Sequence, residues 1–271
     1  MFWRYLLGNI LVKFQNIPYN PRGKQRLVML IEQLFGSQIA VTDEGLKLRI
    51  LPSSSMDAYY FRNDDSILPL KELIKDLSTN SVFIDIGANI GYFSLIASRQ
   101  MQNKGLVISF EPSTRELRRL LENIDLNNAS NIIVMSTGLG SENTIANLFI
   151  SNHTGLNRFS EGIEGSKRHI QKQQPCAILK FDNISTLIED RDVIDLVKID
   201  VEGAELQVLR GMKSFLETKK IKKLFVEITP SFLNDFGDSR EELFQYLDGY
   251  GYKPKFDKHC FQYDELFEIL E

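Results

Sequence analysis

Short apolar runs alternate with stretches of helical periodicity along most of the chain after residue 80. Apolar residues at helical spacing occur at Tyr92–Met101, Thr114–Asn127, Ala204–Glu217 and Arg240–Tyr250. The runs between them, rich in β-branched residues, are typical of strands buried on both faces: Val82–Ile86, Leu106–Phe110, Ile132–Met135, Ile194–Ile199 and Lys223–Ile228. This alternation predicts an α/β fold with a doubly wound, mostly parallel sheet and helices on both faces.

The stretch from residue 138 to residue 182 interrupts this rhythm. It is rich in Ser, Asn, Gly and Gln, and it contains strand-like runs at Ala146–Ser151 and Ala177–Phe181. Long connections without helices of their own often cover the ligand in α/β domains. We therefore expect an insertion of strands and loops here, within a domain that spans residues 81–271.

Residues 1–80 have a different pattern and are expected to form a small N-terminal helical and β-hairpin cap. Apolar spacing predicts a helix over Lys24–Phe35. The segment Ile39–Leu51 contains the turn Asp43-Glu44-Gly45 between two short apolar runs, which predicts a β-hairpin.

The apolar segment Met1–Phe14 has features of a signal or membrane sequence but fails both tests. Arg4 and Lys13 interrupt it, no small-residue cleavage site follows, and a membrane span needs about 20 apolar residues. It is predicted to be a short amphipathic helix on the body of the protein. Contact with a membrane surface, a lipid-linked substrate or a second copy of the chain stays open, through an apolar face of Phe2, Trp3, Leu6, Leu7 and Ile10.

Composition narrows the class of protein. With 271 residues, 43% of them hydrophobic and 25% charged, the chain resembles ordinary globular proteins. Its net charge of −4 argues against a nucleic-acid partner. Cys176 and Cys260 are too few for a disulfide framework, so we expect free thiols and a cytoplasmic location. Neither these cysteines nor His153, His169 and His259 have metal-ligand spacing, and no metal is expected.

A glycine-rich turn follows the first predicted strand. Asp85 lies in this strand, and Gly87 and Gly91 flank the turn before the next helix. The G-x-x-x-G spacing departs from the G-x-G-x-x-G pattern of nicotinamide-binding enzymes. Glu111 ends the second strand, 24 residues after Gly87, where a carboxylate can bind ribose hydroxyls. Together these residues predict a pocket for S-adenosylmethionine. The alternative is that Asp85 and Glu111 only stabilise helix ends.

Acidic residues also gather after the fourth predicted strand, at Asp200, Glu202 and Glu205. Transfer of a methyl group to a hydroxyl needs a positioned acceptor and a base, and Asp200 and Glu202 are the candidates. Lys198 lies in the middle of the same strand, where an unpaired ammonium is costly. We expect it to pair with Glu227 and Asp200, in a cluster that is either catalytic or a structural ion pair. Glu202 and Glu205 can alternatively complement a helix dipole.

Three segments in this order carry a family resemblance: residues 84–93 (IDIGANIGYF), 110–112 (FEP) and 198–205 (KIDVEGAE). With them the chain resembles the FkbM family of S-adenosylmethionine-dependent methyltransferases, over roughly residues 55 to 255. The resemblance implies a Rossmann-like class I methyltransferase with a seven-stranded type of sheet. It also implies methyl transfer to a hydroxyl of a sugar, glycolipid or secondary metabolite. An amine or protein acceptor, an oxidoreductase and a non-catalytic scaffold are the alternatives.

The resemblance also assigns roles to residues. The methionine end of the cofactor would contact the first turn, the ribose would contact the second strand end, and the adenine would contact the loop after the third strand. The residues in question are Asp85, Gly87, Ala88, Asn89 and Gly91, then Glu111 and Pro112, and then Thr137 and Gly138. Asn123 matches a position at which such proteins tend to have asparagine; it can equally be a solvated helix residue.

Overall fold

The computed structural model describes residues 2–17, 23–61, 67–151, 157–159, 170–188, 191, 193–256 and 260–269. All three histidines lie outside these ranges. Their expected lack of a metal role is therefore not examined by the structure, and part of the expected insertion also lies outside.

A seven-stranded sheet forms the centre of the molecule, in the order β11-β12-β10-β9-β3-β4-β5. β12 runs antiparallel to both of its neighbours, and the other pairs are parallel. Its strands are β3 (Val82–Ile86), β4 (Leu106–Phe110), β5 (Ile132–Met135), β9 (Leu196–Ile199), β10 (Lys223–Ile228), β11 (Tyr252–Pro254) and β12 (Tyr263–Ile269). Four of the five predicted strands have their predicted bounds, and the fourth begins two residues later than expected. The edge pair β11–β12 was not predicted.

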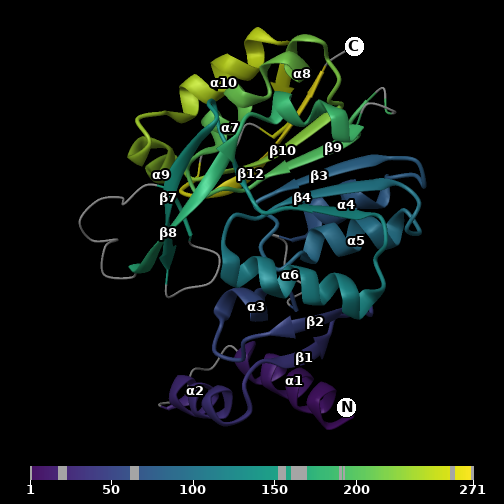
Figure 1. The fold of residues 1–271 in the computed structure, drawn as a ribbon, viewed down its shortest axis with the longest axis vertical. Helices are drawn as coiled ribbons and strands as arrows, with labels where there is room; N and C mark the ends of the chain where they lie inside the picture. Colours follow the sequence, from purple (N-terminus) through teal and green to yellow (C-terminus); the bar gives the residue numbers. More distant parts are fainter. Residues whose placement is uncertain are drawn as a thin grey trace.

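Helices cover both faces of this sheet (Figure 1). One layer holds α4 (Leu68–Lys75), α5 (Tyr92–Gln100) and α6 (Thr114–Asn127), and the other holds α7 (Glu205–Gly211), α8 (Lys213–Glu217) and α10 (Arg240–Gly249), with the short α9 (Pro230–Asp235) nearby. The helix predicted over Ala204–Glu217 is two helices. The break follows Gly211, where a side chain would come within 2.1 Å of the Gly140 carbonyl oxygen.

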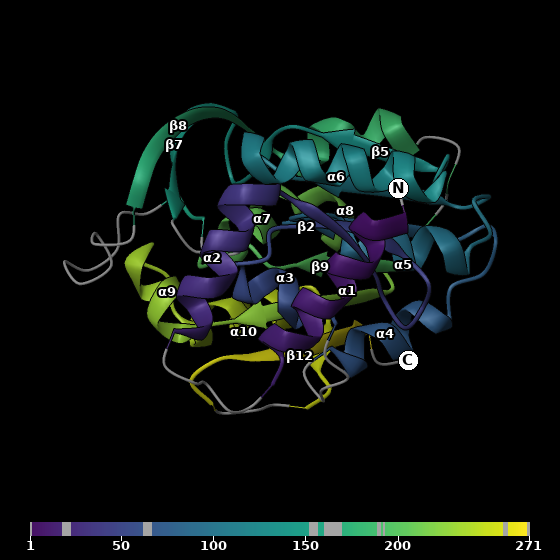
Figure 2. The same cartoon turned by 90° about the horizontal axis from the view of Figure 1, so that it is seen from below.

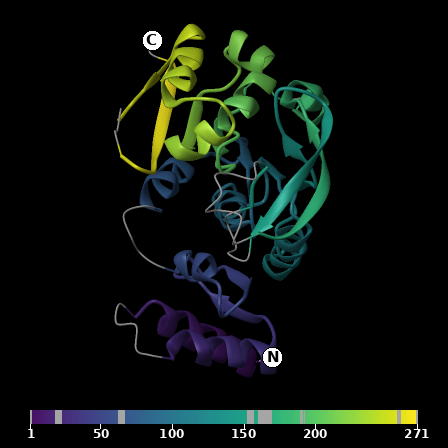
Figure 3. The ribbon, with the colours of Figure 1, turned by 90° about the vertical axis from the view of Figure 1, so that its left-hand side faces the viewer.

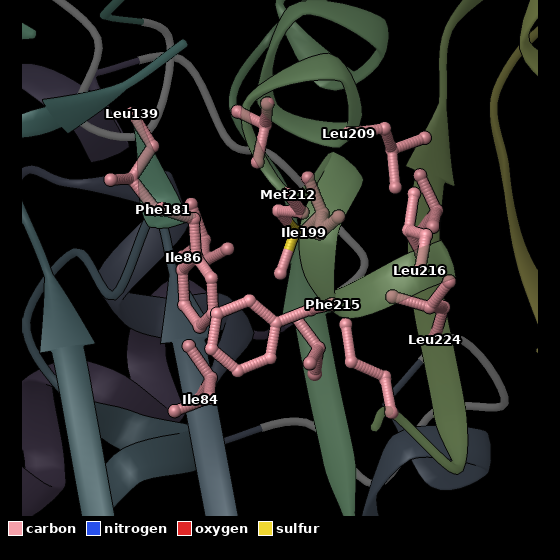
Figure 4. Packing of buried hydrophobic residues seen from close by; sticks show 14 of the residues in the cluster. Ile84, Ile86, Leu139, Phe181, Ile199, Leu209, Met212, Phe215, Leu216 and Leu224 are labelled. Atoms are coloured by element: carbon pink, nitrogen blue, oxygen red, sulfur yellow. The ribbon is translucent and has the colours of Figure 1, made fainter. Parts of the chain in front are cut away.

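The largest hydrophobic core fills the space between the sheet and the α7–α8 layer (Figure 4). Ile84 and Ile86 of β3 and Ile199 of β9 point into it from the sheet, and Phe181 and Phe215 close it from the other side. The rings of Phe181 and Phe215 meet edge to face with centroids 5.0 Å apart. This packing holds β3 and β9 side by side, so that the loops after both strands emerge together.

The insertion forms a second, three-stranded sheet in the order β6-β8-β7. Its strands are β6 (Gly138–Leu139), β7 (Thr144–Ser151) and β8 (Ile170–Leu179), and a 3-10 helix η2 follows over Phe181–Ile188. The predicted run Ala177–Phe181 is therefore wrong at its end. Phe181 leaves the strand because its fully buried ring belongs to the main core.

The N-terminal cap contains α1 (Phe2–Gln15), α2 (Lys24–Phe35), the hairpin β1 (Gln38–Val41) and β2 (Lys47–Ile50), and α3 (Ser55–Tyr59). Figure 2 shows α1 and α2 side by side at the end of the molecule that is farthest from the main sheet in Figure 1. No helix among the described residues is long and apolar enough to cross a membrane.

Two buried polar groups fasten the cap to α6. The Arg119 guanidinium pairs with Asp57 of α3. The Asn123 side chain accepts a hydrogen bond from Arg49 N at 2.6 Å and donates one to Ile90 O at 2.9 Å. Asn123 is thus a buried link between the cap and the glycine-rich turn, and the solvated alternative is wrong.

The predicted boundary at residue 80 does not coincide with a change in packing. Leu70 and Ile74 of α4 are buried against Phe83 of β3 and Met101 beyond α5. α4 therefore belongs to the helix layer of the main sheet, although it precedes residue 80.

Candidate active site

A cavity of about 910 Å³ lies beyond the carboxyl ends of β3, β4, β9 and β10. α3 of the cap and the main sheet both contribute to its walls; Figure 3 shows the cap below and the sheet above. Most of the predicted site residues line it, namely Gly87, Ala88, Asn89, Glu111, Pro112, Thr137, Gly138, Lys198, Asp200, Glu202 and Glu227. Asp85 and Gly91 are the two predicted residues that do not.

The glycine-rich turn brings the backbone of β3 and β9 into contact. Gly87 has a φ of +77°, and a side chain there would come within 1.8 Å of the Asp200 carbonyl oxygen. The amides of Gly87 and Ala88 both donate to the Phe110 carbonyl at 3.0 Å. Gly91 instead lies under Leu120, whose Cδ1 would be 2.2 Å from an added Cβ. Gly91 shapes the turn and is not part of the cavity wall.

Glu111 is held by backbone amides at the edge of this turn. Its carboxylate accepts hydrogen bonds from Asn89 N and Ser113 N, both at 2.8 Å. Burial raises the pKa of Glu111 to about 8, and the neighbouring Glu116 adds to the rise, although the two amides lower it. Each carboxylate oxygen can accept more than one hydrogen bond. Glu111 can therefore bind hydroxyl groups in the cavity while it stays anchored.

Two buried polar atoms beside Glu111 have no hydrogen-bond partner among the described residues. They are Asn89 Oδ1 and Thr137 Oγ1, and both residues line the cavity. Buried polar groups are nearly always paired in proteins, so unpaired ones in a cavity indicate a bound polar molecule. With Glu111, they fit the hydroxyl and amino groups of a nucleoside such as the adenosine part of S-adenosylmethionine.

Asp85 is fully buried beneath the turn and does not line the cavity. Its Oδ2 accepts a hydrogen bond from Ser94 at 2.6 Å, and its Oδ1 lies 3.3 Å from Lys198 Nζ. A direct contact of Asp85 with the cofactor stays a prediction; in this structure the carboxylate faces the Lys198 ammonium. Asp85 supports the turn from below.

Lys198 pairs with one of its two predicted partners and with Asp85 in place of the other. Besides Asp85, its ammonium lies 3.2 Å from Asp200 and donates to Gly87 O at 3.0 Å. The register of the parallel strands explains these contacts. Lys198 of β9 lies opposite Asp85 of β3 on one side and opposite Phe225 of β10 on the other, and Glu227 is two residues further along β10. Burial alone would lower the pKa of Lys198, but Asp200 and Asp85 outweigh it and raise this pKa above its usual range. Asp200 is a partner as predicted, and no ion pair with Glu227 is found among the described residues.

Three carboxylates gather where the cavity meets the ends of β9 and β10. Asp200, Glu202 and Glu227 each place one oxygen within 4.8 Å of the others. Burial, followed by the charge of Asp200, raises the pKa of both Glu202 and Glu227 well above the ordinary carboxyl value. Gln262 of the β11–β12 connection donates to Glu227 at 2.8 Å, and Glu202 Oε2 is buried without a partner among the described residues. A carboxylate with a raised pKa is a stronger base than an ordinary one, so in its ionised form it can take a proton from a hydroxyl.

Glu205 holds the turn after β9, which carries Asp200 and Glu202. Its Oε1 accepts hydrogen bonds from Gly203 N at 2.9 Å and Val201 N at 3.4 Å, and burial raises its pKa to about 7. Gly203, with a φ of +112°, lies where a side chain would be 2.5 Å from Phe232 O. Glu205 and Gly203 are thus structural, while Glu202, at a φ of +58°, faces the cavity.

An aromatic wall of the cavity was not predicted from the sequence. Tyr59 and Tyr60 from the end of α3, Phe93 from α5 and Tyr263 from β12 all line the cavity. The Tyr60 ring lies 4.7 Å from that of Tyr92, and burial followed by the charge of Asp200 raises its pKa well above the usual value. The sequence shows Tyr59 and Tyr60 as adjacent residues in a short segment, and no nearby motif indicates that this segment lies next to the sheet.

The same three carboxylates are the group of described residues that could hold a metal ion. Hard oxygen ligands of this kind suit Mg²⁺. The ammonium of Lys198 already lies beside Asp200 and partly offsets its charge. The expectation of a metal-free site stays a prediction.

The sequence is similar to those of known methyltransferases. The family model of the methyltransferase FkbM domain matches residues 85–254. Methyltransferase 1 of Beauveria bassiana is 27% identical over 147 residues, 49% of this chain and 59% of that protein. Hexuronic acid methyltransferase AglP of Haloferax volcanii is 29% identical over 170 residues, 62% of this chain and 63% of that protein. The chain thus matches about three fifths of the length of these two curated relatives.

Among solved structures, a methyltransferase FkbM from Methylobacillus flagellatus aligns with a TM-score of 0.45 and 20% identity, over 71% of this chain and 44% of that one. The doubly wound sheet with its antiparallel β12 has a Rossmann-like arrangement, and the matched domain is a methyltransferase domain. The protein belongs to the FkbM methyltransferase family, which uses S-adenosylmethionine as methyl donor.

Proposed function

We propose that the protein transfers the methyl group to a hydroxyl oxygen of a sugar, glycolipid or secondary-metabolite acceptor. The observation that carries the proposal is the position of Asp200, Glu202 and Glu227 in the same cavity as Glu111 and the unpaired atoms beside it. The name of the AglP relative, a hexuronic acid methyltransferase, supports a sugar acceptor. Carboxylates suit this chemistry, because a hydroxyl must lose its proton as it is methylated.

The donor end of the cavity would be formed by the glycine turn and the loops after β4 and β5. S-adenosylmethionine, when bound, supplies a methyl group that is activated by its sulfonium charge. Glu111 would accept the ribose hydroxyls, and Asn89 Oδ1 and Thr137 Oγ1 would accept from other polar groups of the donor. Asp200 lies beside the turn, and its negative charge would favour a cationic ligand.

The acceptor end would be formed by Glu202, Glu227 and the aromatic wall. Glu202 Oε2 has no partner among the described residues and can accept a proton from a hydroxyl. Lys198 would act as a positioning residue, because it joins Asp200 to Gly87 O and so fixes the β9 turn relative to the glycine turn. Tyr59 and Tyr60 would pack against the apolar face of the acceptor ring and orient its hydroxyl.

Calorimetric titration with S-adenosylmethionine tests the donor site. We expect binding by the wild type, weaker binding by Glu111→Ala and Asn89→Ala, and unchanged binding by Glu142→Gln, an exposed acid outside the cavity. Incubation with methyl-labelled donor and a panel of glycans, hydroxylated metabolites and amines then tests the acceptor. Label on a hydroxyl supports the proposal, and label on amines alone refutes it. Donor binding without transfer to any of these compounds would favour a scaffold.

A further inference from the structure

Helix α2 has an unusual distribution of side chains. Lys24, Val28 and Glu32 follow one another at four-residue spacing and face the rest of the cap. Lys24 and Val28 are buried, and the Lys24 ammonium donates to Gln15 O at 2.9 Å and Ile17 O at 3.0 Å, the last carbonyls around α1. Glu32 accepts from Ser53 N at 2.8 Å. These contacts fix which side of the helix faces inward.

Three leucines of α2 instead face solvent. Leu27, Leu30 and Leu34, at helical spacing i, i+3 and i+7, are 49%, 51% and 67% exposed. An amphipathic helix in a globular protein normally buries its leucines, whereas α2 exposes these three and buries Lys24. Of the 13 large hydrophobic residues that are exposed in the described part of the chain, seven lie between residues 10 and 35. Such a concentration marks an interaction surface.

Charge is unevenly distributed along the chain. Residues 1–36 contain five lysines or arginines and one glutamate, a formal charge of +4, whereas the whole chain carries −4. The other 235 residues therefore carry −8. Lys13 of α1 and Arg26 of α2 are both exposed, and the one acidic residue, Glu32, is already bonded to Ser53 N. The leucine face thus lies in a locally basic segment of an acidic protein.

We propose that the outer face of α2, formed by Leu27, Leu30 and Leu34, docks on an anionic membrane surface. The leucines would enter the boundary between headgroups and acyl chains, while Lys13 and Arg26 would lie near lipid phosphates. An apolar stripe and a basic segment together make a reversible interfacial anchor. A symmetric dimer through this face is disfavoured, because it would bring two segments of charge +4 together. The proposal does not depend on the methylation reaction.

Sedimentation of the full-length protein with vesicles tests the proposal. The probes are vesicles of phosphatidylcholine alone and of equal parts phosphatidylcholine and phosphatidylglycerol. We expect binding to the anionic vesicles and little to the neutral ones, with a loss of binding as salt is raised. The triple variant Leu27→Gln, Leu30→Gln, Leu34→Gln should lower the partition coefficient about tenfold or more, and Arg26→Glu should lower it less.

The matched control is the double variant Ile145→Gln, Phe261→Gln, which removes two residues that are 77% and 78% exposed elsewhere on the protein. It should bind like the wild type. Circular dichroism should give the same thermal midpoint for all variants, and Arg26→Glu keeps the test valid if the triple variant unfolds. The proposal would be overturned if the triple variant and Arg26→Glu both bound anionic vesicles as strongly as the wild type. So would a dimer in solution that the leucine substitutions dissociate and anionic vesicles do not.

Discussion

Substitution of Lys198 by methionine removes the cation on which the buried carboxylate of Asp85 depends. Methionine keeps most of the volume of the lysine stem, so the cost comes mainly from charge. Asp85 is fully buried, with Lys198 Nζ 3.3 Å away, whereas the Asp200 side chain is 29% exposed and can be solvated. Removal of one partner of a buried pair costs about 3–5 kcal/mol. With one of the two carboxylates screened by water, we expect about 3 kcal/mol.

Urea unfolding at pH 7 measures this loss of unfolding free energy. We expect the slope of the unfolding free energy against urea concentration to be the same in the variant and the wild type. Lys222→Met is the control. Its ammonium lies 2.7 Å from Asp195 but is 57% exposed, and a surface pair of this kind contributes about 1 kcal/mol or less. The second variant, Lys198→Met with Asp85→Asn, should recover about 1–2 kcal/mol, because asparagine carries no charge and can still accept from Ser94. A deficit of Lys198→Met under about 1 kcal/mol, or a further loss on adding Asp85→Asn, would refute the argument.

Three other predictions concern the donor site, the acceptor site and the cap. Donor affinity should rise as Glu111 ionises near its pKa of about 8, and Glu111→Gln should weaken binding about tenfold or more and abolish this pH dependence in titrations. The methylation rate should rise with pH through a pKa above the ordinary carboxyl value of about 4.3. The base is whichever of Glu202 and Glu227 loses this rise in rate, together with a fall in kcat of about 10²–10⁴-fold, when it is replaced by glutamine. Asn123→Ala should destabilise the protein by about 2–3 kcal/mol in thermal unfolding, because Arg49 N and Ile90 O lose their partner; a change under about 0.5 kcal/mol would contradict this.

Local patterns were sufficient for much of the central sheet. Strands such as Val82–Ile86 and Leu106–Phe110 are short β-branched runs between helical segments, and their bounds were predicted from this contrast alone. The glycine turn and Glu111 could be assigned to one site, because the carboxyl ends of parallel strands meet at one edge of the sheet. The edge pair was missed because β12, which carries Asp264, Glu265 and Glu268, has no continuous apolar run.

Only the tertiary structure decided which of these residues touch. Lys198 pairs with Asp85 and not with Glu227 because strand register places it opposite Asp85, and register is a relation between strands that no single segment encodes. Tyr60 reaches the cavity because the distant pair Arg119–Asp57 holds α3 against α6. The sequence by itself thus determined five strands of the sheet, the order of the motifs and the residue types at the carboxyl ends of these strands. Contacts between distant segments determined which carboxylates are buried, which are neutralised and which face the cavity.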